Sequence, residues 1–175
     1  MHSYRYRGKP DQVLASPAFA DAGLPGGFSF FSWSELSPVE RQAIQERQAG
    51  GGWYPCALDF FQLEGFIEPA AGVGLHFDGR VVGWIVTHGK GPETVQYTNL
   101  FVSREVRSVR RAGLTIALIA EALRRQITRG IPIGVFQVEA DNQPLLRFTR
   151  RYLEPYMTMS ELRVARKLLA LPSGP

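Results

Sequence analysis

Residues 95–140 are the part of the sequence that most constrains the fold. An apolar run, VQYTNLFVS at 95–103, precedes a helical pattern at Leu114–Thr128 and a second apolar run, IPIGVFQVEA at 131–140. The apolar side chains of the helical pattern recur every three or four residues, which is typical of a helix with one buried face. A strand–helix–strand unit of this length predicts a right-handed crossover between two parallel strands. We therefore expect an α/β fold with parallel strands near its centre.

The remaining strands are expected to pair antiparallel. The runs GVGLHF and RVVGWIVTHG flank Asp78-Gly79, a dipeptide that favours the tight turn of a β-hairpin. The aromatic run at Phe28–Trp33 suits a further strand, and residues 156–166 suit the last one. Together these segments predict an α/β (α+β) fold, with a mixed, mostly antiparallel central sheet of about six or seven strands flanked by helices.

Local signals also place helices before the hairpin. A helix is expected from Pro38, where Ser37 and Glu40 form a capping box, to the glycines at 50–52. A short helix is expected after Pro55.

The N-terminal segment differs from the rest of the chain. Residues 1–27 are rich in Pro, Gly and Ala and poor in periodicity, so they predict an irregular N-terminal arm with at most a short strand at Tyr4–Arg7. Residues 28–175 are expected to form a single domain, because a 175-residue chain with 45% apolar residues has the size and composition of one globular domain.

Composition argues against several classes of protein. No apolar stretch approaches the roughly 20 residues that a membrane-spanning helix needs. Cys56 is the single cysteine and cannot form an internal disulfide, which suits a reducing compartment and predicts a cytoplasmic protein. His2, His76 and His88 lack the spacing of metal ligands, so no structural metal is expected.

Charge is distributed unevenly along the chain. Residues 1–103 carry 7 basic and 10 acidic side chains, whereas residues 104–175 carry 13 basic and 6 acidic ones. A basic half indicates an anionic partner. On this ground alone a nucleic acid, a membrane surface and a phosphorylated cofactor all remain open, as does a solvated arginine-rich surface.

The start of the central helical pattern is the candidate phosphate site. The N-terminus of a helix presents unpaired N–H groups and the positive end of the helix dipole, so it binds phosphate readily. Arg110 and Arg111 add positive charge there, and Gly113 allows a ligand to approach the backbone closely. An ordinary amphipathic surface helix has the same residue pattern, so the position between a strand and a helix is what favours the phosphate interpretation.

The spacing of these residues resembles the GNAT superfamily of CoA-dependent acyltransferases. Arg110 and Gly113 match the family motif Gln/Arg-x-x-Gly-x-Gly/Ala, which follows a strand in the family. Gly130 ends the next helix, and Asn142 lies in VEADNQPLLRFTRRYL, which is similar to the family segment V-x-x-x-N-x-x-A-x-x-x-Y. FDGRVVGWIVTH is similar to the central hairpin of the family. The resemblance covers about residues 28–160.

The resemblance implies that acyl-CoA binds where the two parallel strands splay apart. Backbone groups of Leu100, Phe101 and Val102 would pair with the pantetheine arm, and Asn142 would contact the pantetheine or the thiol end. The backbone amides that would hold the pyrophosphate are those of Arg110, Arg111, Ala112, Gly113, Leu114 and Thr115.

Three positions depart from the family pattern. Thr115 stands where the family has Gly or Ala, and Thr149 stands where it places the tyrosine that protonates the departing thiolate. Gln96 stands where many members place a glutamate base. Tyr152 and Glu139 are therefore the expected catalytic residues, Tyr152 as the general acid and Glu139 as the general base.

The function implied is that of an acyl-CoA-dependent N-acyltransferase, most simply one that transfers acetyl from acetyl-CoA to a primary amine by direct attack. The acceptor would be a small-molecule or peptide amine. No nucleic-acid or membrane partner and no metal is expected, and the dimerisation common in the family allows a homodimer. The alternative is a catalytically weak or inactive GNAT-like domain that binds CoA or a partner, because the usual tyrosine and glutamate are absent.

Overall fold

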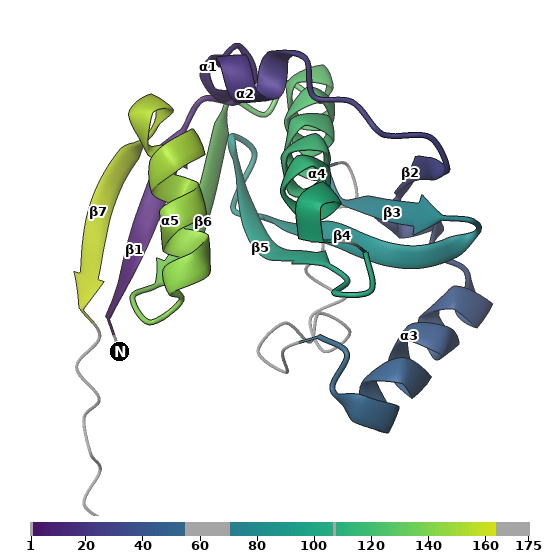
Figure 1. The fold of residues 1–175 in the computed structure, drawn as a ribbon. Helices are drawn as coiled ribbons and strands as arrows, with labels where there is room; N and C mark the ends of the chain where they lie inside the picture. The colour runs from purple at the N-terminus through teal and green to yellow at the C-terminus, as the bar shows by residue number, and fades with distance from the viewer. Residues whose placement is uncertain (1, 55–70, 107, 164–175) are drawn as a thin grey trace, which may run out of the picture.

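The computed structural model describes residues 2–54, 71–106 and 108–163. In this part of the chain seven strands form one sheet in the order β2-β3-β4-β5-β6-β1-β7 (Figure 1). All neighbouring pairs are antiparallel except β5 and β6, which are parallel. The expected mixed, mostly antiparallel sheet flanked by helices is confirmed. The strands are β1 (His2–Gly8), β2 (Phe28–Ser32), β3 (Val73–Phe77), β4 (Arg80–Gly89), β5 (Thr94–Val102), β6 (Ile133–Glu139) and β7 (Thr158–Arg163).

Helices cover both faces of the sheet. α4 packs across β3, β4 and β5, with α1 and α2 lying against it, and α5 lies over β1 and β6 on the same face (Figure 1). α3 covers part of the opposite face. The helical elements are α1 (Pro10–Leu14), α2 (Pro17–Ala20), η1 (Trp33–Glu35), α3 (Pro38–Gly51), α4 (Ser108–Thr128), α5 (Gln143–Tyr152) and η4 (Glu154–Tyr156).

Two apolar clusters hold these layers together. Under α4, Val82 of β4 packs with Leu114 and Leu118, both of which are fully buried. On the other face, Trp84 of β4 packs with Ile44 of α3. Removal of these side chains from water is the main favourable contribution to folding, so β4 joins the two halves of the core.

The start of α3 follows its local signals. The Ser37 hydroxyl accepts a hydrogen bond from the Glu40 N–H (3.2 Å), and the Glu40 carboxylate accepts one from the Ser37 N–H (2.9 Å). Pro38 occupies the first helical position, and Gly52 ends the helix in the left-handed conformation with φ 64°. The capping box predicted from the sequence is confirmed, whereas the short helix expected after Pro55 lies outside the described residues.

The first 27 residues are not an irregular arm. Residues 2–8 form β1, which lies between β6 and β7 and pairs with both along almost its whole length. Residues 10–14 and 17–20 form two short helices, each with a proline at its start. The short strand expected at Tyr4–Arg7 lies within β1, whereas the irregular arm expected around it is wrong, because these residues have no long apolar periodicity. The stability of β1 comes from two strands that lie far away in the sequence.

The central helix begins earlier than its periodicity suggests. α4 starts at Ser108, so residues 110–115 lie within its first two turns and not in the loop before it. The last strand begins at Thr158, two residues later than expected, because η4 occupies residues 154–156; residues 164–166 of the expected strand lie outside the described residues.

Candidate functional site

β5 and β6 separate after pairing over four residues. Their parallel register runs from Thr94 opposite Ile133 to Tyr97 opposite Phe136, and no pairs follow. Beyond Tyr97, β5 turns away towards β4, so a V-shaped gap opens at the C-terminal ends of both strands (Figure 1). The parallel pair expected to splay apart does so, and the apex of the gap lies at Tyr97 and Phe136.

A β-bulge lies at this apex. Asn99 pairs with Val86 and Tyr97 with Thr87, which leaves Thr98 as an extra residue of β5. A bulge bends its strand and increases the local twist. The bulge at Thr98 is therefore the local cause of the separation of β5 from β6.

The backbone of β5 beyond the bulge presents unused groups to the gap. The Ser103 N–H donates to the Val82 carbonyl (2.8 Å), and hydrogen-bonded and non-hydrogen-bonded pairs alternate in an antiparallel ladder. The backbone groups of Val102 and Leu100 therefore point away from β4 and into the gap. Those of Phe101 point towards β4. Leu100 and Val102 are thus available to an added extended chain, whereas Phe101 is not.

The closed end of the gap is held by a buried polar pair. The Tyr97 hydroxyl donates to Gln126 of α4 (2.5 Å), and the Gln126 amide donates to the Ile131 carbonyl (3.0 Å). Burial raises the pKa of Tyr97 well above its ordinary value, so the phenol stays neutral. Gly134 lies close beside this pair, because a Cβ there would lie 3.1 Å from the Tyr97 ring and 3.2 Å from Gln126.

The buried hydroxyl of Thr149 lies level with the apex of the gap. The end of β6 and the start of α5 lie side by side, because the Asn142 N–H donates to the Glu139 carbonyl. From Asn142, Thr149 lies about 10 Å further along α5 at a rise of 1.5 Å per residue. Phe136 lies about 10 Å back along β6 from Glu139 at 3.3 Å per residue. Since α5 runs antiparallel to β6 on its surface (Figure 1), Thr149 is level with Phe136. Thr149 is fully buried, and its hydroxyl has no hydrogen-bond partner in the described part of the chain.

Solved structures with the same arrangement include GCN5-related N-acetyltransferases. No family model matches the sequence, and no curated protein is significantly similar to it. A GCN5-related N-acetyltransferase from Sphaerobacter thermophilus superimposes with a TM-score of 0.61 at 18% identity, over 91% of this chain and 49% of that one. One from Kribbella flavida gives 0.57 at 19% identity, over 92% of this chain and 57% of that one.

The chain has the GNAT fold.

The chain spans about half the length of these two proteins. An acetyltransferase from Streptococcus agalactiae is matched over its whole length, with a TM-score of 0.55 at 13% identity over 80% of this chain. Identities this low establish the shared fold and nothing finer.

In this GNAT fold, the helix start differs from the site expected at residues 110–115. Within a helix that begins at Ser108, the N–H groups from Ala112 onwards bond to carbonyls four residues earlier. The Thr115 hydroxyl also bonds within the helix, donating to the Arg111 carbonyl (2.9 Å). Of the amides expected at the pyrophosphate, those of residues 112–115 therefore have partners within α4, whereas the amides in the first turn of a helix have none within it.

The other residues expected to bind the cofactor have different places in the structure. Leu114 is fully buried in the core under α4, so its side chain is structural. Gly113 is exposed, and a Cβ placed on it would meet nothing within 4 Å. Asn142 caps α5, where its side-chain oxygen accepts a hydrogen bond from the Leu145 N–H (3.2 Å).

The two expected catalytic residues lie apart in this fold. Val138 packs beneath α5, so Glu139, its neighbour in β6, points to the opposite face of the sheet. Glu139 is exposed and about 10 Å from the apex along the strand. Tyr152 lies almost one turn beyond Thr149, where it packs against Phe148 with 5.0 Å between ring centroids. The structure does not bring Tyr152 and Glu139 together.

The loop from β5 to α4 is tied to α3. The buried Ser103 hydroxyl accepts hydrogen bonds from the Trp53 indole (3.1 Å) and the Glu105 N–H (3.2 Å). Arg47 of α3 forms an ion pair with Glu105 and lies 3.9 Å over the Trp53 ring. A cavity of about 540 Å³ lies beside this loop, with Arg80 among its lining residues. These contacts could not be predicted from local sequence, because Trp53 and Ser103 are far apart in the chain.

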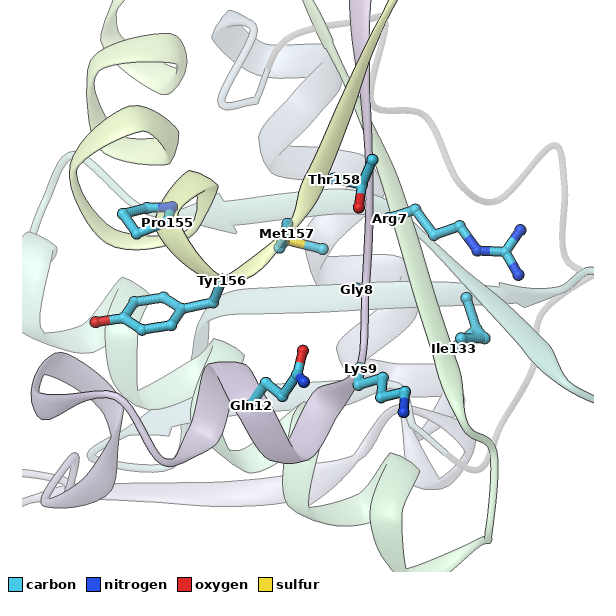
Figure 2. A pocket seen from close by; sticks show the side chains of 9 residues that line it. All are labelled: Arg7, Gly8, Lys9, Gln12, Ile133, Pro155, Tyr156, Met157 and Thr158. Carbon is cyan, nitrogen blue, oxygen red and sulfur yellow. The ribbon is translucent and has the colours of Figure 1, made fainter.

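A second cavity lies at the other end of the sheet. It measures about 710 Å³ and lies around Gly8 at the end of β1, with Lys9, Gln12 and Tyr156 among its lining residues (Figure 2). It adjoins Ile133, which lies at the end of the paired part of β5 and β6 that is farther from the gap. It is therefore separate from the gap.

The described residues contain no group of three or more side chains that could hold a metal ion. No helix among them is long and apolar enough to cross a membrane.

Proposed function

We propose that the protein is an acyl-CoA-dependent N-acyltransferase that transfers acetyl from acetyl-CoA to a primary amine by direct attack. The observation that carries this proposal is the gap between β5 and β6, towards which Leu100 and Val102 present backbone groups that pair with no other strand of the described part of the chain. A pantetheine arm contains two amides, so it would pair with this edge as an added strand does.

The surroundings of the gap fit such a ligand. The free amides in the first turn of α4 and the positive end of its dipole would face the pyrophosphate. The unpartnered Thr149 hydroxyl near the apex would supply a donor to a buried carbonyl or thiolate. We therefore propose that Thr149, rather than Tyr152, lies next to the thiol of CoA.

The acceptor would be a small-molecule or peptide amine that approaches from the face of α3. On that face the exposed carboxylate of Glu139 would favour a cationic group.

The alternative is a GNAT-like domain that binds CoA without turning it over. The separation of Tyr152 from Glu139 favours this alternative. The two functions are distinguished by measuring thiol release from acetyl-CoA across a broad panel of amines. Binding of acetyl-CoA without thiol release would support the alternative.

The cofactor assignment is tested at Gly113. We expect Gly113→Glu to fold normally, because the position is open, and to lose acetyl-CoA binding through repulsion between the new carboxylate and the pyrophosphate. Gly113→Gln has similar bulk without charge, and we expect it to retain most of the affinity. Isothermal titration calorimetry with acetyl-CoA measures both. Equal affinity of the folded Glu variant and the original protein would contradict the placement of the pyrophosphate over this helix start.

A further inference from the structure

His88 and Thr98 form a hydrogen-bonded pair at the bulge. The distance from His88 Nδ1 to Thr98 Oγ1 is 2.5 Å. Thr98 Oγ1 lies farther, 3.4 Å, from the other acceptor within reach, the Gln96 carbonyl. In the His88 tautomer that carries its proton on Nε2, the Thr98 hydroxyl donates to Nδ1; in the other tautomer, Nδ1–H donates to Thr98 Oγ1, which in turn donates to the Gln96 carbonyl.

This pair lies at the apex of the gap. Thr98 is the first residue of β5 after the last pair with β6. His88 is buried in β4 and lies on the same face as Trp84 and Val86, because alternate residues of a strand share a face. That face is the one α3 covers, opposite to α4 and α5. Thr98 is half-buried, and its hydroxyl contacts the buried imidazole of His88.

The chemistry of the pair is that of a proton relay. A hydroxyl bonded to a neutral imidazole can receive a proton from one side while it passes its own proton to the ring. A histidine is suited to this task because its ordinary pKa lies near neutrality. If Thr98 served only to hold His88 in place, it would not have to be the bulged residue of β5 beside the gap.

We infer that Thr98 and His88 take the proton from the acceptor amine, with Thr98 in contact with the amine and His88 accepting the proton behind it. The inference rests on the proposed function and supplies the base that Gln96 does not provide. Glu139 is less suited, since it lies at the wide end of the gap.

The protons balance as follows. The ammonium form of the amine gives one proton to Thr98 Oγ1, and the Thr98 hydroxyl proton moves to His88 Nδ1. The freed lone pair forms the new N–C bond to the thioester carbonyl, and the C–S bond breaks with its electrons on sulfur. A second proton leaves the nitrogen as the amide forms and is taken up by the sulfur, which is released as a thiol; the proton held on His88 is then lost to solvent.

The test compares two amines of almost equal size. Ethylamine is protonated at neutral pH and needs the relay, whereas methoxyamine is largely unprotonated and does not. For Thr98→Val we expect a loss of about 100-fold in kcat/KM with ethylamine and a much smaller loss with methoxyamine. Thr98→Ser restores the hydroxyl and is expected to recover most of the ethylamine rate. Thr94→Val, the same change at the paired end of β5, serves as the matched control and should alter neither rate.

A second measurement does not depend on turnover. Imidazole signals of His88, assigned by nuclear magnetic resonance with a His88→Gln variant, should shift when acetyl-CoA saturates the protein. Equal losses with both amines, no loss, or unshifted His88 signals in the presence of bound acetyl-CoA would each overturn the relay while leaving the proposed function intact. Absence of acetyl-CoA binding, or of thiol release with every amine of a broad panel that includes these two, would instead overturn the proposed function and the relay with it.

Discussion

Val102 and Phe101 are neighbours in β5, yet their backbone groups face different strands. The alternation of the ladder with β4 directs the Phe101 groups to β4 and the Val102 groups to the gap. Local sequence cannot distinguish the two, since both are apolar residues of one strand. The difference matters because the N–H and carbonyl groups that face the gap are those that a ligand can use.

Because the backbone groups of Val102 and Phe101 point in different directions, a proline should have a different effect at each position. Val102→Pro removes an N–H that no strand uses, at the end of β5, so we expect the fold to persist with acetyl-CoA affinity reduced by about 10-fold for one lost hydrogen bond. Val102→Thr keeps the N–H and should bind as the original protein does. Phe101→Pro breaks a ladder hydrogen bond and should be strongly destabilised. Calorimetric affinity and circular dichroism measure the outcomes, and full affinity in Val102→Pro would show that this N–H is not used.

At the scale of elements, the Glu40 carboxylate links the start of α3 to β3. Glu40 accepts hydrogen bonds from the Ser37 N–H and hydroxyl, the latter at 2.6 Å, and its other oxygen lies 2.6 Å from His76 of β3. The His76 ring stacks on Phe31 with 4.2 Å between centroids. The capping box was evident in the sequence, but the link to His76 exists only because β3 lies beside the helix start.

The pKa of Glu40 gives this link a pH dependence. Burial opposes ionisation, but the hydrogen bonds from Ser37 and the contact with His76 outweigh it and lower the pKa of Glu40 below its usual value. The stabilisation is therefore complete above the ordinary carboxyl pKa of about 4.3 and is lost as pH falls through the lower folded-state value.

We expect Glu40→Gln to reduce the free energy of unfolding at neutral pH and to make its decline in acid shallower. Urea denaturation from neutral pH to about pH 3 measures this. Glu46→Gln, on the exposed part of the same helix, is the control. Parallel pH profiles for the original protein and Glu40→Gln would contradict the assignment.

At the scale of the whole molecule, the N-terminal strand joins the last two strands of the chain. β1 lies between β6 and β7, so the half of the sheet that bears α5 depends on the first eight residues. Tyr6 is 1% exposed and stacks on Phe136 with 4.9 Å between centroids. Phe136 also marks the apex of the gap, so β1 supports the site from outside it.

Truncation of Tyr6 should therefore affect the whole molecule. We expect Tyr6→Ala to lower the free energy of unfolding by about 3–5 kcal/mol, through lost burial and the cavity left beside Phe136. Arg5→Ala, at an exposed position of the same strand, should change it by no more than about 0.5 kcal/mol. Chemical denaturation measures both. A small effect at Tyr6 would mean that β1 is not integral to the sheet.

The sequence by itself determined the elements whose signals are local. The strand–helix–strand unit, the Asp78-Gly79 hairpin and the Ser37 capping box all follow from periodicity, turn chemistry and capping within a few residues. The parallel strands on either side of the candidate site were predicted for this reason. The boundary of α4 was misplaced, because its first turn lacks the apolar periodicity of the rest.

Only the tertiary structure decided the features that depend on distant residues. The place of β1, the bulge at Thr98 and the direction of the Val102 groups are set by pairing with strands that are remote in the sequence. The hydrogen bond between His88 and Thr98 and the separation of Tyr152 from Glu139 both follow from how these strands pair. Strand register decides which face each side chain occupies, and register is a property of two strands together, so neither strand's residues specify it alone.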